Sequence, residues 1–228
     1  MKKLFLLLAV FLCPASSNAQ AIPVNAMTYL PRLVEAQREY WASAPIPDFM
    51  AGQVEQESCI TLKHSKCWNP NAQLKTSREW GRGLGQVTTA YRADGSVRFD
   101  TQAELRRQFK ELSGWTTERW ADPDYQIRAI VLQDRTLFER AGWAFNDYER
   151  VAFTLSGYNG GFGGVLQDRR LCANTKGCNP DKWFGHVEKH SLKSKTPWKG
   201  YGKSAFEINR EYVDQILNTR RFKYERYF

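Results

Sequence analysis

Apolar residues recur at intervals of three and four along most of this chain, which is the spacing of amphipathic helices. The pattern predicts a mainly helical protein, with helices over residues 26–41, 48–59, 101–112, 122–140, 147–156, 181–190 and 204–218. Pro31 is expected to interrupt or restart the first helix. No linker, repeat or low-complexity tract divides the chain, so one domain is expected.

Capping residues mark several predicted helix starts. Asp48 is a candidate cap, Thr101 and Glu104 have the spacing of a capping box, and Asp122-Pro123 begins the next helix. The glycine-rich run 157–164 is expected to break the helix before it, at Gly157, and to let backbone approach a ligand closely.

One segment has the pattern of a β-hairpin. The Asp94-Gly95 turn lies between two short stretches rich in Thr, Tyr, Val and Phe, from residue 87 to residue 99. The expected fold class is therefore mainly α, with one small β-hairpin in an α+β arrangement.

A carboxylate lies in the middle of an apolar helix face. Along residues 48–60, the apolar arc is formed by Phe49, Met50, Val54 and Ile60. Glu57 lies near the centre of this arc and Glu55 on the opposite side, so only Glu57 is expected to be buried. Burial raises the pKa of a carboxyl group, which lets it act as a general acid near neutral pH. The ordinary alternatives are a solvated carboxylate or a buried one paired with Arg.

The first residues have the composition of a secretory signal peptide. Met1-Lys2-Lys3 precedes an apolar run over residues 4–12 and the small-residue pattern Ser17-Asn18-Ala19. The run is shorter than the ~20 residues of a spanning helix, and no later segment approaches that length. Residues 1–19 are therefore predicted to be a signal peptide that is removed together with Cys13. Residues 20–228 would be one exported domain, periplasmic or secreted, without an integral membrane segment.

Four cysteines remain in two close pairs, Cys59 with Cys67 and Cys172 with Cys178. Such cysteines close into disulfides in an oxidising environment. Three pairings are open, of which the two local ones are preferred. Zinc is the competing interpretation, but neither pair has CxxC spacing and the three histidines complete no persuasive ligand set. No metal and no cofactor is expected.

The chain is basic, with 33 Lys and Arg against 24 Asp and Glu, and a net charge of +9 that becomes +7 without Lys2 and Lys3. This charge attracts polyanions such as bacterial cell wall, nucleic acid or anionic membrane, and by itself does not choose among them.

Four short segments occur in a characteristic order. They are Glu57-Ser58; Asn69-Pro70-Asn71-Ala72 followed by Ser77 and Gly83-Leu84-Gly85-Gln86; Ser156-Gly157-Tyr158-Asn159-Gly160-Gly161; and Phe206-Glu207-Ile208-Asn209-Arg210-Glu211-Tyr212-Val213. In this order the chain resembles the catalytic domain of SLT-type lytic transglycosylases and goose-type lysozymes, which cut the glycan strands of peptidoglycan. The resemblance implies a lysozyme-like α+β fold with the hairpin beside an active-site cleft, and peptidoglycan as the partner.

The chain departs from the family pattern at several positions. Met is usual where Gly85 stands, a small residue where Trp80 stands, and Ala where Gly160 stands; the stretch between Ala72 and Ser77 is usually shorter. These differences affect the fit of the substrate more than the acid.

The resemblance also implies roles for individual residues. Glu57 would be the catalytic acid, and Tyr158 would lie against it and help to set its proton. The residues expected to bind substrate are Ser58, Gln86, Tyr158, Asn159 and Glu207. The ordinary alternatives are core packing or turn structure for Tyr158 and Gln86, and a surface helix carboxylate for Glu207.

Cleavage of a glycosidic bond needs a protonated carboxyl at the leaving oxygen and, ordinarily, a second carboxylate that stabilises the oxocarbenium-like centre. Asp94 and Asp100 are the candidates for the second carboxylate, with a turn residue and a helix cap as their ordinary alternatives. The resemblance implies instead that the substrate's acetamido group assists and the muramic 6-hydroxyl closes the ring, giving 1,6-anhydromuramic ends. A hydrolytic muramidase or endolysin is the alternative.

The sequence supports other functions less well. His186-x-Glu188-x-His190 lacks the HExxH spacing of a metallopeptidase. The basic, aromatic tail over residues 220–228 could bind anionic wall polymer, whereas the exported address and the lack of a binding motif argue against nucleic acid. A non-catalytic wall-binding component of a secretion, conjugation or phage machine would keep the fold without the reaction. A monomer is expected.

Overall fold

The computed structural model describes residues 21–198 and 202–228, so the predicted signal peptide and Cys13 lie outside the described residues. The described α-helices are α1 (Ala26–Trp41), α2 (Phe49–Ser58), α3 (Thr101–Gln108), α4 (Pro123–Arg140), α5 (Asp147–Gly160), α6 (Phe162–Ala173) and α7 (Ala205–Gln215). The described strands are β1 (Gln73–Lys75), β2 (Glu79–Arg82), β3 (Val87–Tyr91) and β4 (Val97–Asp100). The mainly α fold class with a small antiparallel sheet is confirmed.

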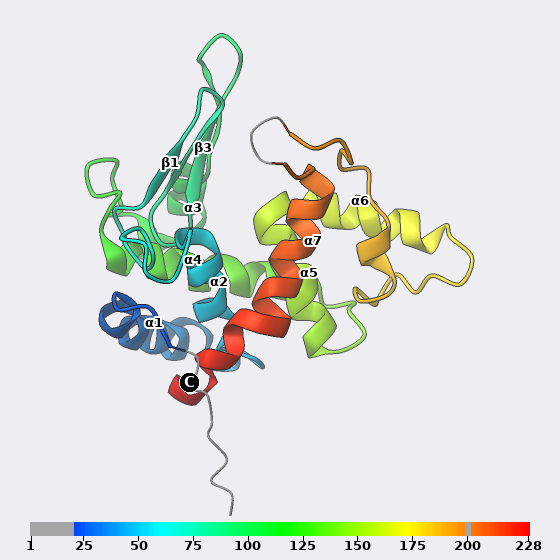
Figure 1. Cartoon of the computed structure of the whole chain (residues 1–228), viewed down its shortest axis with the longest axis horizontal. Coiled ribbons are helices and arrows are strands. Elements are labelled where there is room, and N and C mark those ends of the chain that lie inside the picture. Colours follow the sequence, from blue (N-terminus) through cyan, green and yellow to red (C-terminus); the bar gives the residue numbers. More distant parts are fainter. Residues whose placement is uncertain (1–20, 199–201) are drawn as a thin grey trace, which may run out of the picture.

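The sheet is larger than the sequence indicated. Its four strands are antiparallel in the order β1-β2-β3-β4, and the predicted hairpin is the β3–β4 pair, with Thr89 opposite Asp100. Strands β1 and β2 were not predicted, because they contain three and four residues, too few for a clear alternation of apolar and polar positions. In Figure 1 the sheet projects from one side of the helical body, with α3 and α4 behind it.

Two apolar cores hold these layers together. The main core contains residues of α1, α2, α4, α5, α6 and α7. A smaller core joins the sheet to α3 and α4 through Val87, Leu105, Leu112, Trp115 and Leu132. Helix α4 contributes to both cores, so it fixes the sheet relative to the helical body (Figure 1).

Helix α2 is buried on more sides than its sequence pattern indicated. Glu55, expected on the exposed side, is fully buried, whereas Ile60, expected on the apolar arc, is 69% exposed. The prediction was wrong for both residues. The reason is tertiary: the C-terminal segment after α7, residues 216–224, packs across α2 and covers the side that carries Glu55.

Three cations of the basic tail, Arg220, Arg221 and Lys223, pair with buried carboxylates, whereas Arg226 is exposed. Arg220 and Lys223 pair with Glu55 at 2.7 and 2.8 Å, and the Tyr224 hydroxyl donates to Glu55 at 2.5 Å. Arg221 pairs with Asp48 at 2.8 Å. These contacts place the C-terminal segment on the helix that carries Glu57.

Two of the predicted helix caps are displaced. The side chain of Asp48 does not cap α2 but accepts from Arg221, and Asp100 caps α3 by accepting from the Ala103 N–H at 3.1 Å. The predicted capping box was wrong, because the cap is one residue before Thr101 and the third residue after the cap, Ala103, has no polar side chain to return the hydrogen bond. Asp122 caps α4 as expected, and α1 runs through Pro31 without interruption.

The helix break near residue 160 also differs from the prediction. Helix α5 continues through Gly157 to Gly160, and the chain turns at Gly161, whose φ of 77° favours glycine. Helix α6 follows at once and was not predicted. Residues 181–190 form only one 3-10 turn, Val187–Lys189. Burial of Gly157 against Phe162 and Val165 of α6 outweighs its low helix propensity.

Both preferred disulfides are present, Cys59–Cys67 and Cys172–Cys178. The first ties the residue after α2 to the following loop, and the second ties the end of α6 to its following loop. Among the described helices, none combines the length and apolar character needed to cross a membrane.

Candidate active site

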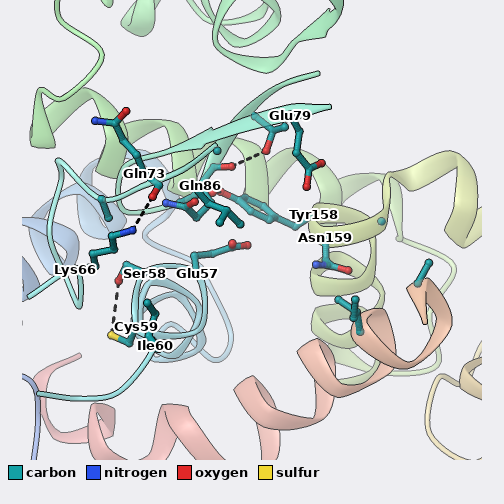
Figure 2. Close-up of a pocket in the computed structure, with 18 of the residues that line it drawn as sticks. Glu57, Ser58, Cys59, Ile60, Lys66, Gln73, Glu79, Gln86, Tyr158 and Asn159 are labelled. Carbon is teal, nitrogen blue, oxygen red and sulfur yellow. Dashed lines mark hydrogen bonds between the residues drawn. The ribbon is translucent and has the colours of Figure 1, made fainter. Parts of the chain in front are cut away.

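A cleft of about 630 Å³ lies at the C-terminal end of α2. Its walls come from the loop after α2, strands β1, β2 and β3, the end of α5, the segment before α7, and the start of α7. Figure 2 shows the Glu57 side chain between these walls, facing Tyr158 and Asn159 from α5 and Gln86 from the loop before β3. The cleft thus joins the motif residues Glu57, Gln86, Tyr158 and Asn159, which are far apart in the sequence.

Glu57 has the environment of a general acid. Burial raises the pKa of its carboxyl from 4.5 to about 7, and a hydrogen bond from the Tyr212 hydroxyl at 2.7 Å opposes part of that rise. Of the ion pairs within residues 21–198 and 202–228, none involves Glu57. Close to neutral pH the carboxyl can therefore both hold and release a proton.

The tyrosine bonded to Glu57 is Tyr212 of α7, not Tyr158. The Tyr158 hydroxyl lines the cleft but donates to the carbonyl of Gly85 at 2.9 Å. Burial raises the pKa of both phenols well above the usual value, so both remain donors. Tyr212 lies in a motif segment, but at a buried helix position where sequence alone does not distinguish a site residue from core packing.

Gly85 provides both the acceptor and the space for the Tyr158 hydroxyl. A Cβ at Gly85 would lie 2.5 Å from the Tyr158 hydroxyl, so the glycine leaves room for the phenol. Gln86 next to it has a φ of 45° and donates from Nε2 to the Gly83 carbonyl at 2.9 Å. Gln86 is therefore held by its own loop while it lines the cleft.

Asn159 is oriented from behind by a buried amide. The Asn209 Nδ2 donates to Asn159 Oδ1 at 3.0 Å, and Asn209 is itself held by the Ser156 hydroxyl at 3.0 Å. Since Oδ1 of Asn159 accepts from Asn209, its amide N–H groups are the donors that it offers to the cleft (Figure 2). Asn209 was not predicted as a positioning residue.

Ser58 lines the cleft, but its hydroxyl is used internally. It donates to the Val54 carbonyl at 2.6 Å and accepts from the Trp68 N–H at 2.9 Å. Its proton is thus committed to α2, and its expected contact with substrate amides would be limited to the remaining lone pair.

Three predicted acidic residues lie outside the cleft lining. Asp94 accepts from Ser96 in the β3–β4 turn, Asp100 caps α3, and Glu207 forms a capping box with Ser204 at the start of α7. These are the ordinary structural alternatives that the sequence offered for Asp94 and Asp100. Hydrogen bonds from Ser96 and Ser204 lower the pKa values of Asp94 and Glu207, so both carboxylates stay ionised.

Glu79 of β2 is the carboxylate that sequence reasoning missed. It lines the cleft, and Figure 2 shows it on the wall opposite Glu57, near Asn159. Because strand β2 was not predicted, the sequence pattern did not indicate on which face of the sheet Glu79 lies.

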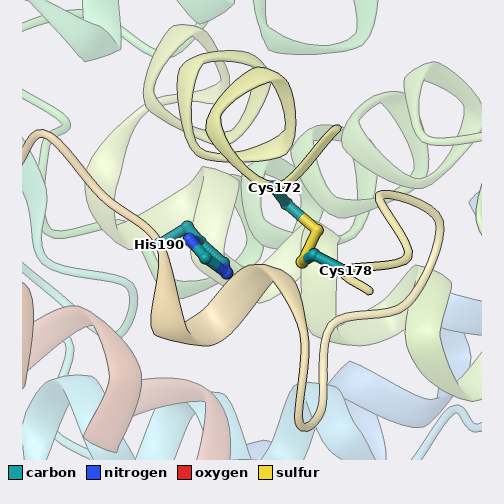
Figure 3. A group of neighbouring side chains, drawn as sticks. All are labelled: Cys172, Cys178 and His190. Carbon is teal, nitrogen blue, oxygen red and sulfur yellow. A yellow bond between two sulfur atoms is a disulfide. The ribbon is translucent and has the colours of Figure 1, made fainter. Parts of the chain in front are cut away.

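The described residues contain one group with the proximity of a metal site, Cys172, Cys178 and His190. Figure 3 shows the two sulfur atoms bonded to each other, so neither is a thiolate ligand. His186 accepts the Asn179 N–H through Nδ1 at 3.1 Å and takes no part in this group.

Comparison with curated proteins finds several named membrane-bound lytic murein transglycosylase F. The protein of Yersinia enterocolitica is 26% identical over 183 residues, which are 78% of this chain and 32% of the relative. That of Yersinia pestis is 28% identical over 177 residues, 76% of this chain and 31% of the relative. A Vibrio cholerae protein of this name is 30% identical over 98 residues, 42% of this chain and 18% of the relative.

No family model matches the chain. The curated similarities nevertheless confirm the resemblance to SLT-type lytic transglycosylases that the four motifs indicated. The chain spans about a third of the length of the first two relatives.

Proposed function

We propose that this protein is a peptidoglycan lytic transglycosylase that uses Glu57 as its single acid and base. The observation that supports it most directly is the half-buried Glu57 carboxyl in a cleft, held by Tyr212 and without a described cation beside it. The names of the relatives support the same reaction class.

The proposed reaction breaks the bond between N-acetylmuramic acid and N-acetylglucosamine. Glu57 gives its proton to the glycosidic oxygen as the bond to the muramic anomeric carbon breaks, and the carbonyl oxygen of the acetamido group stabilises that carbon. The Glu57 carboxylate then takes the proton of the muramic 6-hydroxyl, whose oxygen bonds to the anomeric carbon. The product has a 1,6-anhydromuramic end, and Glu57 is protonated again, so no water is consumed.

A pKa of about 7 suits both halves of this reaction. A carboxyl with an ordinary pKa would be ionised at neutral pH and could not supply the proton. A carboxyl with a much higher pKa would be a stronger base in the second step but too weak an acid in the first. Tyr212 holds the value between these limits, because its hydrogen bond favours the ionised form.

Glu79 supports one competing function, the hydrolytic muramidase. In that reaction a second carboxylate stabilises the anomeric carbon or activates water. Glu79 lines the cleft with Glu57, whereas Asp94 and Asp100 do not. If the protein hydrolyses its substrate, Glu79 is the carboxylate that would stabilise the anomeric carbon or activate water.

The proposed setting is outside the cytoplasm, with peptidoglycan as substrate. The two disulfides and the signal-like N-terminal sequence support export. Association with a secretion, conjugation or phage machine is compatible with such a wall-cutting role.

The test is digestion of purified sacculi by residues 20–228, with mass spectrometry of the released muropeptides. We expect anhydromuramic ends from the wild type and at least a hundredfold less release by Glu57→Gln. Glu79→Gln should retain the anhydro product, and Asp94→Asn, an exposed turn substitution, serves as the matched control.

The other outcomes contradict the proposal in distinguishable ways. Reducing ends that are lost in Glu79→Gln would establish hydrolysis. Equal release by Glu57→Gln would refute the choice of acid. A folded wild type that binds sacculi and releases nothing would favour a non-catalytic wall-binding component.

A further inference from the structure

Lys193 brings a positive charge to the cleft along a path that two glycines keep open. It lies in the segment before α7 and lines the cleft with Asn159 and Gly160. A Cβ at Gly160 would lie 2.8 Å from the Lys193 Cε, and a Cβ at Gly164 would lie 2.9 Å from its Nζ. The aliphatic part of Lys193 therefore passes directly over the α5–α6 junction, where a larger residue would displace it.

The ammonium group of Lys193 is only partly neutralised. It lies 3.4 Å from Asp168 Oδ2, but the same oxygen is 2.8 Å from the Arg210 guanidinium. The other oxygen of Asp168 accepts from the Ser191 hydroxyl at 2.8 Å. One carboxylate thus faces two cations, and the closer contact belongs to Arg210.

This arrangement leaves a half-buried cation with donors to spare. An ammonium group has three N–H donors, and the long contact with Asp168 accounts for one. Burial, together with the Arg210 charge, lowers the pKa of Lys193 by more than Asp168 raises it, so its charged form is less stabilised here than in water. An anion arriving from the cleft would stabilise it.

The position of Lys193 identifies the part of a glycan that it would meet. Gly160, which lies under the lysine, directly follows Asn159, whose amide donors face the cleft. A sugar bound by Asn159 would therefore have one of its substituents close to the ammonium group. In peptidoglycan, muramic acid alone carries an acidic substituent, through its lactyl group.

We propose that Lys193 forms a subsite for a carboxylate carried by the lactyl substituent of muramic acid. This inference rests on the proposed peptidoglycan substrate. It adds the side chain by which the cleft would distinguish muramic acid from glucosamine. The carboxylate can be that of the lactyl group itself on peptide-free strands, or one on the attached peptide.

Binding measurements in the Glu57→Gln background test the inference without requiring catalysis. Three soluble ligands are titrated calorimetrically: peptide-bearing glycan fragments, the same fragments stripped by an amidase so that the lactyl carboxylate is free, and uncharged chitotetraose. We expect Lys193→Met, which retains the aliphatic side chain, to weaken binding of a carboxylate ligand about tenfold. Its binding of chitotetraose should be unchanged.

Lys195→Met is the charge-matched control. Lys195 is exposed, two residues away, and its ammonium lies over the Phe206 ring at 4.9 Å rather than in the cleft lining. We expect this variant to bind all three ligands like its parent. Higher salt should weaken carboxylate binding by the parent more than by Lys193→Met.

Each outcome separates the possibilities. Loss confined to peptide-bearing fragments identifies a peptide carboxylate, and loss on stripped fragments identifies the lactyl carboxylate; both support the subsite. Unchanged binding of every ligand, equal loss on chitotetraose, or no binding by the parent would overturn it. A wild type that fails to digest sacculi while Lys193 still governs carboxylate binding would refute the proposed reaction and leave the subsite standing.

Discussion

Tyr212 and Glu57 lie 155 positions apart in the sequence and meet through a hydrogen bond of 2.7 Å. The phenol comes from α7 and the carboxyl from the end of α2, so the packing of these helices sets the protonation of the candidate acid. Burial and this hydrogen bond act in opposite directions on the pKa of Glu57.

Tyr212→Phe should therefore raise the pKa of Glu57 above about 7, because it removes the group that favours the ionised form. If protonated Glu57 starts the reaction, the falling limb of kcat/KM against pH moves to higher pH. The pH profile of sacculus digestion measures this shift. Tyr158→Phe is the matched control, since Tyr158 bonds to Gly85 instead. A limb that moves to lower pH, or moves equally in the control, contradicts the assignment.

Glu57→Gln should stabilise the fold at neutral and alkaline pH while it abolishes activity. The folded pKa is raised from 4.5 to about 7, so the unfolded chain loses its proton first and stability falls as the pH rises through this window. The variant lacks this penalty. After allowance for partial exposure, we expect a gain of about 1–2 kcal/mol above pH 7 and none below pH 4. Urea unfolding of both proteins above pH 7 and below pH 4 measures this difference in stability. A variant that is less stable than the wild type at pH 8 would contradict the expected direction of the effect.

Asp134→Asn should also stabilise the protein at neutral pH. Asp134 is fully buried on α4, and burial raises the pKa of its carboxyl well above the ordinary value. It accepts from Gln53 Nε2 at 3.3 Å, and a protonated Asp134 can donate back to Gln53 Oε1. Asn keeps this pairing without a titrating group.

Because the folded pKa of Asp134 is raised, its cost to stability grows as the pH rises above about 3.8. We expect Asp134→Asn to gain at least about 1 kcal/mol at pH 7.5 and little at pH 3.5. Asp134→Ala removes the hydrogen-bond partner of Gln53, so this variant should lose stability at both pH values. A destabilised Asn variant at pH 7.5 would show that Asp134 is ionised in the fold.

Arg220→Met should destabilise the protein through the C-terminal segment. It removes one of two cations from the fully buried Glu55 while Lys223 remains, so we expect a loss of about 1.5–3 kcal/mol, that of one hydrogen bond to a charged group. Urea unfolding measures this loss. Arg226→Met is the control, since Arg226 contacts only the neighbouring Tyr227 among the described side-chain hydrogen bonds. Equal stability of the two variants would mean that the tail does not support α2.

Local sequence patterns determined much of this protein. Helix periodicity located α1, α2, α4 and α7, turn chemistry located the β3–β4 hairpin, and cysteine spacing favoured both disulfides. Glu57 could be selected because its position on α2 and the order of the four motifs agree. Apart from the motif order, each of these signals lies within one element or a short segment.

Only the tertiary structure decided which groups surround the acid. Tyr212 bonds to Glu57, Glu79 shares the cleft, and the tail buries Glu55, through contacts between residues far apart in the chain or through a strand too short to predict. An amphipathic pattern shows that a face is apolar, but not what covers the other faces of the helix. Burial, and with it the pKa of a carboxyl, depends on all of those neighbours.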